Sequence, residues 1–270
     1  MAIMDCVGRA GVPDAGGDDL LLLRKAMRTA LIVGNWKMHK LIAEAVAFTA
    51  DVLPRLSGTR AEIALAPAFT ALGPLVQAVG GTGVAIYAQN MHEAPFGPFT
   101  GEVSAPMLVE LGVAGVILGH SERRRLFGET DRALRRKVPA ALRARLRPIL
   151  CVGQSDRSGG GHELRQQLQE DLAGVDEEQL ADVVIAYEPL WAIGTGTAAT
   201  CAQAQEASAF VRALVAERSP AAAERIRILY GGCVTPAASG ELLAQPDVDG
   251  ALVADASLDP VSFAAIVAAA

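Results

Sequence analysis

The chain has 270 residues, a formal net charge of -6 and 51% hydrophobic residues, values typical of one soluble domain with a large core. They exclude a disordered or fibrous protein, and a mild acidic excess without a basic cluster argues against nucleic acid as a partner. The longest apolar run near the N-terminus, residues 20–23, is too short for a secretory leader or a membrane span, so the cytoplasm is the expected location.

The N-terminal segment differs from the rest of the chain. Residues 1–29 are rich in Gly and Asp, and we predict that they form a flexible extension. Residues 30–270 are expected to form a single catalytic domain. Met27 would itself be a natural start for that domain, so the residues before it could reflect the choice of start codon.

Short apolar runs rich in Val and Ile recur along the domain, and each is followed by a segment with helical periodicity. The expected strands are residues 31–36, 62–66, 83–88, 113–118, 147–152, 182–187, 225–230 and 249–253. The expected helices are residues 41–54, 70–79, 104–111, 130–145, 161–173, 200–218, 236–244 and 259–269, with start signals at Thr70, Ser104, Thr130 and Thr235.

This even rhythm predicts an α/β fold of the closed (β/α)8 barrel type. The strands are apolar throughout, as parallel strands covered on both faces must be. A doubly wound open sheet is the alternative, but it would need a reversal of strand order that the pattern does not demand.

Active sites of such barrels lie at the carboxyl ends of the strands. Polar or glycine-rich segments follow the strands as this rule requires: Asn35-Trp36-Lys37, His120-Ser121-Glu122, Glu188, Gly231-Gly232-Cys233 and Ala254-Asp255. The cysteines and histidines are scattered without the spacing of metal ligands or of a disulfide framework, so no metal is expected.

The segment around Glu188 is the most informative. One carboxylate stands between the apolar run 183–187 and a loop in which Gly194 and Gly196 permit backbone angles closed to other residues. Such a loop could close over a ligand and exclude water from a base. The alternative is a glutamate that merely ends a strand.

Several motifs together resemble the triosephosphate isomerase family over essentially the whole barrel. They are Gly34-Asn35-Trp36-Lys37-Met38, Ala88-Gln89-Asn90, Phe99-Thr100-Gly101-Glu102, Leu118-Gly119-His120-Ser121-Glu122-Arg123-Arg124, Gly128-Glu129-Thr130, the Glu188 segment and Tyr230-Gly231-Gly232. This family is itself the standard example of a carboxylate base, a neutral histidine and a closing loop, so the roles below are carried over from it.

The resemblance implies a cofactor-independent interconversion of dihydroxyacetone phosphate and D-glyceraldehyde 3-phosphate. Glu188 would move a proton between adjacent carbons, His120 would donate a hydrogen bond to the oxyanion, and Lys37 would supply positive charge. Asn35 would brace the substrate. The groups expected to position these side chains or to hold the lid are Ser121, Glu122, Arg124 and Tyr230.

The phosphate would be held by Gly194 and by the turns after the last two strands, where this chain departs from the family. Cys233 replaces a serine, and Ala254-Asp255 replaces a pair of glycines. Asp255 either faces the phosphate and repels it or turns away and caps the following short helix. Gln154 and Thr197 are lesser departures.

The resemblance also implies a homodimer formed through the loop 92–102, with Thr100 at its tip. Two other functions stay open on the sequence alone because the phosphate cradle is altered. One is isomerisation of a related sugar phosphate, such as a four-carbon one, and the other is a barrel of low activity with a binding role.

Overall fold

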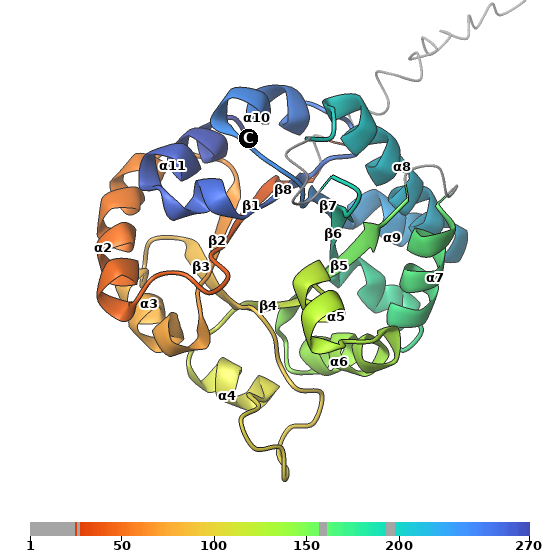
Figure 1. Cartoon of the computed structure of the whole chain (residues 1–270), viewed down its shortest axis with the longest axis horizontal. Coiled ribbons are helices and arrows are strands. Elements are labelled where there is room, and N and C mark those ends of the chain that lie inside the picture. The colour runs from red at the N-terminus through yellow and green to blue at the C-terminus, as the bar shows by residue number, and fades with distance from the viewer. Residues whose placement is uncertain (1–24, 26–27, 157–160, 193–197) are drawn as a thin grey trace, which may run out of the picture.

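The computed structural model describes residues 25, 28–156, 161–192 and 198–270 (Figure 1). Eight parallel strands pair in sequence order and close into a barrel, with β1 bonded to β8. The strands are β1 (Leu31–Asn35), β2 (Glu62–Ala66), β3 (Val84–Ala88), β4 (Gly115–Leu118), β5 (Arg147–Gln154), β6 (Val184–Pro189), β7 (Arg227–Tyr230) and β8 (Gly250–Val253).

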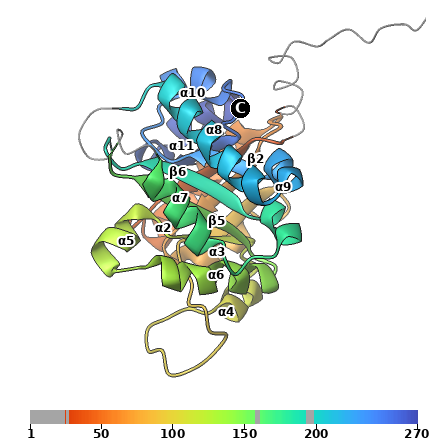
Figure 2. The same ribbon diagram turned by 90° about the vertical axis from the view of Figure 1, so that its right-hand side faces the viewer.

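Helices surround the barrel on its outside (Figures 1 and 2). They are α2 (Ile42–Val52), α3 (Leu72–Ala78), α4 (Ala105–Glu110), α5 (Ser121–Phe127), α6 (Asp131–Arg143), α7 (His162–Asp171), α8 (Cys201–Arg218), α9 (Pro220–Arg225), α10 (Pro236–Leu243) and α11 (Pro260–Ala268). Short 3-10 helices are η1 (Leu53–Leu56), η2 (Phe69–Ala71), η3 (Glu177–Asp182) and η4 (Asp255–Leu258). None of the helices in the described ranges has the length and apolarity needed to cross a membrane.

The (β/α)8 barrel expected from the sequence is confirmed, and the open doubly wound sheet is wrong. Every expected strand and helix ends within two residues of its expected bounds. Thr130 and Thr235 cap α6 and α10 as expected, each accepting a backbone N–H. Thr70 does not start a helix, because it lies inside η2 while α3 begins at Leu72.

The core has two layers. Alternate strand residues point into the barrel and pack together, among them Val33, Ile117, Ile149 and Leu229, while the intervening ones pack against the helices. Gly250 is required where β8 meets β1: its φ is +149°, and a Cβ there would lie 2.0 Å from the Leu31 carbonyl oxygen.

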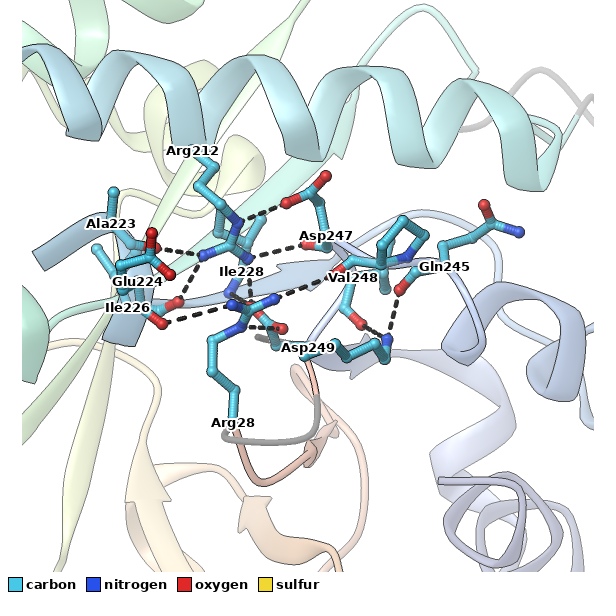
Figure 3. Close-up of polar contacts among 12 residues, drawn as sticks. Arg28, Arg212, Ala223, Glu224, Ile226, Ile228, Gln245, Asp247, Val248 and Asp249 are labelled. Carbon is cyan, nitrogen blue, oxygen red and sulfur yellow. Dashed lines mark hydrogen bonds and ion pairs between the residues drawn. The ribbon is translucent and has the colours of Figure 1, made fainter. Parts of the chain in front are cut away.

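A polar cluster lies at the end of the barrel at which the strands begin (Figure 3). Asp249 is fully buried and accepts from Arg28 Nε at 2.7 Å and from an Arg212 terminal nitrogen at 2.6 Å. Lys25 Nζ donates to the carbonyls of Gln245 and Val248. Two residues of the predicted extension, Lys25 and Arg28, thus bond to the barrel, and residues 1–24 and 26–27 lie outside the described residues.

Candidate active site

A cavity of about 460 Å³ lies at the carboxyl ends of the strands. Most of the residues expected from the sequence line it: Asn35, Lys37, His120, Ser121, Glu122, Glu188, Cys233, Ala254 and Asp255. They come from the carboxyl ends of β1 and β6 and from the segments that follow β1, β4, β7 and β8, so the barrel brings together residues far apart in the chain. Gly194 lies outside the described residues.

The turn after β1 presents Lys37 to the cavity. Lys37 has a φ of +50°, and its backbone N–H donates to Oδ1 of the buried Asn35 at 3.1 Å, which stabilises the turn locally. The Gln89 amide nitrogen donates to the carbonyls of Lys37 and Ala66, each at 2.8 Å, and so ties the turn to β2. The motif Ala88-Gln89-Asn90 does not by itself predict that Gln89 braces this turn.

Lys37 is paired with Glu122 from the start of α5. The Lys37 ammonium lies 2.8 Å from Glu122 Oε1, and both side chains are about one-third exposed. Partial burial acts to raise the pKa of Glu122, but the hydrogen bond and positive charge of Lys37 outweigh it and lower that pKa. Glu122 is therefore a carboxylate that holds the ammonium in place at the cavity wall.

His120 occupies the N-cap position of α5. Its Nδ1 accepts the backbone N–H of Glu122 at 3.3 Å. A ring nitrogen that accepts a hydrogen bond carries no proton, so the imidazole is neutral and bears its proton on Nε2. That nitrogen is only 3.3 Å from Glu188 Oε1, inside the cavity. The local backbone thus makes His120 a neutral donor.

Glu188 lies near the end of β6 and is 2% exposed. Both of its carboxylate oxygens are bonded to Ser121 at the start of α5. The backbone N–H donates to Oε2 at 2.9 Å and the hydroxyl to Oε1 at 2.8 Å. Gly231, which follows β7, leaves room for this side chain, because a Cβ there would lie 3.1 Å from Glu188 Cγ. A buried carboxyl group held this way is placed to act as a base.

The family model of triosephosphate isomerase matches residues 30–270. The chain belongs to the triosephosphate isomerase family. Among its relatives, the triosephosphate isomerase of Symbiobacterium thermophilum is 53% identical over 250 residues, which cover 90% of this chain and 98% of the relative. Those of Moorella thermoacetica and Solibacter usitatus are 49% and 48% identical, covering 89% of this chain and 98% and 99% of the relatives.

Among the departures from the triosephosphate isomerase pattern, Cys233 and Asp255 line the cavity, Gln154 does not, and Thr197 lies outside the described residues. Cys233 is exposed, and Asp255 is the exposed first residue of η4. The N-cap position of η4 belongs to Ala254, and the Asp255 carboxylate makes no hydrogen bond within the described part of the chain. Of the two interpretations of Asp255, the one in which its side chain caps η4 is therefore wrong, and the residue forms part of the cavity wall.

Two other predicted residues stand behind the cavity. Tyr230 is buried at the end of β7 and folds over Gly232, where a Cβ would lie 2.2 Å from the phenol oxygen. Its hydroxyl has no partner among the described residues, and burial raises its pKa above the usual range. The contact expected between Tyr230 and the lid cannot be described, because residues 193–197 lie outside the described residues. Arg124 does not line the cavity but donates to the Gly119 carbonyl behind His120 at 2.8 Å.

Arg125 is a cavity-lining residue that the sequence analysis does not predict. It adds a cation to the cavity wall near Glu122. The sequence places Arg125 near the start of the segment that forms α5, but it does not indicate which face of this short helix turns toward the cavity.

Proposed function

We propose that the chain interconverts dihydroxyacetone phosphate and D-glyceraldehyde 3-phosphate by moving a proton between adjacent carbons through an enediol(ate). The observation that carries this proposal is the convergence of Glu188, His120 and Lys37 on one cavity. Membership of the triosephosphate isomerase family supports the choice of substrates.

The reaction begins with Glu188. Its two oxygens are occupied by Ser121 in the structure, so the carboxylate must leave these hydrogen bonds to approach the substrate carbon. It then takes a proton from the carbon next to the carbonyl, and the resulting carboxylic acid returns it to the neighbouring carbon. One acid–base group serves both carbons because the planar intermediate exposes them on the same face.

His120 and Lys37 stabilise the negative charge that develops on oxygen. The Nε2–H of the neutral imidazole donates to the oxygen atoms of the enediolate, and the Lys37 ammonium supplies positive charge to them and to the phosphate. Neither needs a proton change before the reaction, since the backbone of Glu122 sets the histidine tautomer and its carboxylate holds the lysine.

An isotope experiment tests the proposal. Isomerisation in deuterium oxide should place solvent deuterium on the carbon that receives the proton, because the carboxylic acid formed from Glu188 exchanges with solvent. Mass spectrometry and proton NMR of the product measure it. Deuterium on that carbon would show that the proton passes through a group that exchanges with solvent, as proton transfer by Glu188 requires and direct hydride transfer does not allow. Absence of turnover with either triose phosphate would contradict the function.

We propose in addition that two copies associate through the loop 92–102, which protrudes between β3 and α4 (Figure 1). The loop is internally braced: His92 stacks on Phe99 at 4.0 Å between ring centroids, and its N–H donates to Val103. Phe96 is 84% exposed, and α5 exposes Leu126 and Phe127 as well. Such apolar surface is typical of a face that a partner covers.

Sedimentation velocity tests the dimer. The parent should sediment as a dimer, and Phe96→Asp should shift it toward the monomer. A matched change in an exposed residue away from this surface, Val261→Asp, should leave the parent's state unchanged. A monomeric parent at micromolar concentration would contradict the proposal. The cytoplasmic location stays a prediction from the sequence.

A further inference from the structure

A buried carboxylate outside the cavity has no part in the reaction just described. Asp171 is the last residue of α7, and its side chain is wholly inaccessible to solvent. Its Oδ2 accepts from a terminal nitrogen of Arg124 at 2.6 Å, while its Oδ1 has no hydrogen-bond partner among the described residues. A buried charge is unfavourable unless it is paired, so the contact with Arg124 defines what this carboxylate does.

Arg124 connects Asp171 to several elements around the end of β4. Its Nε donates to the Gly119 carbonyl at 2.8 Å, and a terminal nitrogen donates to the Cys151 carbonyl of β5 at 3.1 Å. Its other terminal nitrogen is paired with Asp131 at the start of α6. The planar guanidinium is therefore fixed on several sides, and Asp171 holds the side that faces α7.

The guanidinium is in direct contact with the peptide that carries His120. Gly119 precedes His120 and has a φ of +72°, and a Cβ there would lie 3.0 Å from Arg124 Nη2. The backbone N–H of Arg124 also donates to the His120 carbonyl at 3.1 Å. A shift of the guanidinium would consequently move the turn from which the imidazole reaches Glu188.

We propose that Asp171 is a positioning residue for His120: it fixes the Arg124 guanidinium against the Gly119 carbonyl and thereby holds the imidazole in line with Glu188. The inference rests on the proposed isomerase function. Asp171 touches no reacting atom, so its effect passes entirely through Arg124 and the β4–α5 turn.

The charges around Asp171 indicate that its hold on Arg124 varies with pH. Burial raises the pKa of Asp171 to about 7; the positive charge of Arg124 opposes this shift, and Asp131 adds to it. The charged groups that act on it are Arg124 from α5 and Asp131 from α6. Ionisation near neutral pH strengthens the pair with Arg124.

The test compares two buried acids with different surroundings. Asp171→Asn keeps the shape of the side chain and removes its charge. Asp249→Asn does the same to a carboxyl that is equally inaccessible and is also paired with arginine, in this case with Arg28 and Arg212, but at the opposite end of the barrel. Both variants should lower the melting temperature, so a difference between them in kinetics reports position rather than stability.

For Asp171→Asn we expect kcat to fall about tenfold with KM within about twofold of the parent, since misplacement of a catalytic group acts on the transition state. The imidazole signals of His120 in nitrogen-15 NMR, assigned with His120→Gln, should shift. The fall in kcat should be greater above pH 7.5 than at pH 6. Asp249→Asn should leave kcat and the His120 signals as in the parent.

The outcomes separate the inference from the function on which it rests. A parent without isomerase activity overturns the function. An active parent whose Asp171→Asn variant keeps its kcat and its His120 signals, with only a lower melting temperature, overturns the positioning role. Asp171→Ala is the second variant if the first does not fold, and failure of both to fold while Asp249→Asn folds would assign Asp171 a purely structural role.

Discussion

His120 Nε2 lies 3.3 Å from Glu188 Oε1, so the hydrogen-bond donor and the base of the proposed reaction face each other across the same small volume. Both are nearly inaccessible to solvent: Glu188 is 2% exposed and His120 9%. Solvent therefore has little access to either group. The electrostatic effect of each on the developing charge is correspondingly strong.

Replacement of Glu188 by glutamine should abolish most of the turnover. The amide cannot take up a proton, yet its oxygen can still accept from Ser121, so folding and substrate binding should be retained. Loss of a general base lowers kcat by about 100-fold or more, with a small change in KM. Steady-state kinetics in both directions measure it, and a Glu188→Gln enzyme with the parent's kcat would exclude Glu188 as the base.

Replacement of Lys37 by methionine should impair binding and chemistry together. The methionine keeps the apolar stem but removes the charge that contacts Glu122 at 2.8 Å. Because the ammonium is expected to serve both phosphate and enediolate, KM should rise and kcat should fall, each by about tenfold or more. Kinetics unchanged in both parameters would place Lys37 outside the reaction.

Asp255→Gly should improve the affinity for triose phosphates. A carboxylate about 6 Å from one phosphate charge opposes binding by about 3 kcal/mol at an effective dielectric constant of about 20, so KM should fall by up to about a hundredfold. Asp255→Asn removes the charge but does not introduce glycine, so comparison of the two variants distinguishes the effect of the charge from the effect of a more flexible backbone.

Asp259 offers a matched control for Asp255. It is an exposed aspartate nearby in the chain, whose carboxylate caps α11 by accepting the Ser262 N–H at 2.8 Å. Asp259→Gly removes the same charge outside the cavity wall and should leave KM as in the parent. If both variants change KM alike, or if neither does, the cavity position of Asp255 has no bearing on substrate affinity.

Asp171 should make the stability of the protein depend on pH. Its pKa is raised to about 7 in the folded state, so between about pH 4 and pH 7 the folded protein binds more protons than the unfolded chain. This contribution to stability is complete below about pH 4 and is lost as the pH rises to about 7.

Urea unfolding at pH 5 and pH 8 measures this effect. From pH 5 to pH 8 the free energy of unfolding of Asp171→Asn should increase by about 3 kcal/mol relative to that of the parent, because only the parent loses the stability that the raised pKa of Asp171 provides. A difference between variant and parent that is the same at both pH values would show that the buried carboxyl titrates as it does in the unfolded chain.

The barrel could be predicted from the sequence because its determinants are local. A buried parallel strand needs a short apolar run whatever its partners are, and helix starts such as Thr130 and Thr235 act on their own backbone. The site residues followed from the same pattern, since strand ends converge in a closed barrel. The family resemblance supplied their expected roles, which geometry alone does not assign.

The remaining features depend on contacts between distant segments. The pairing of Arg124 with Asp171 requires knowledge of how α5 and α7 pack around β5, and nothing near either residue signals it. Gln89 reaches two carbonyls on neighbouring segments, and Lys25 reaches carbonyls that follow α10. Asp255 is a further case, because its backbone position was predictable while its side-chain surroundings were not.

The cluster of Arg28, Arg212, Asp247 and Asp249 secures the barrel at the edge where its strands begin, whereas the cavity lies where they end. The ion pairs of this cluster are thus separated from the reactive side chains by the full height of the same strands. Loops at the reactive rim can be redesigned without disturbing the ion pairs at the base. The scaffold therefore suits directed evolution of new substrate preferences from a foundation that stays intact.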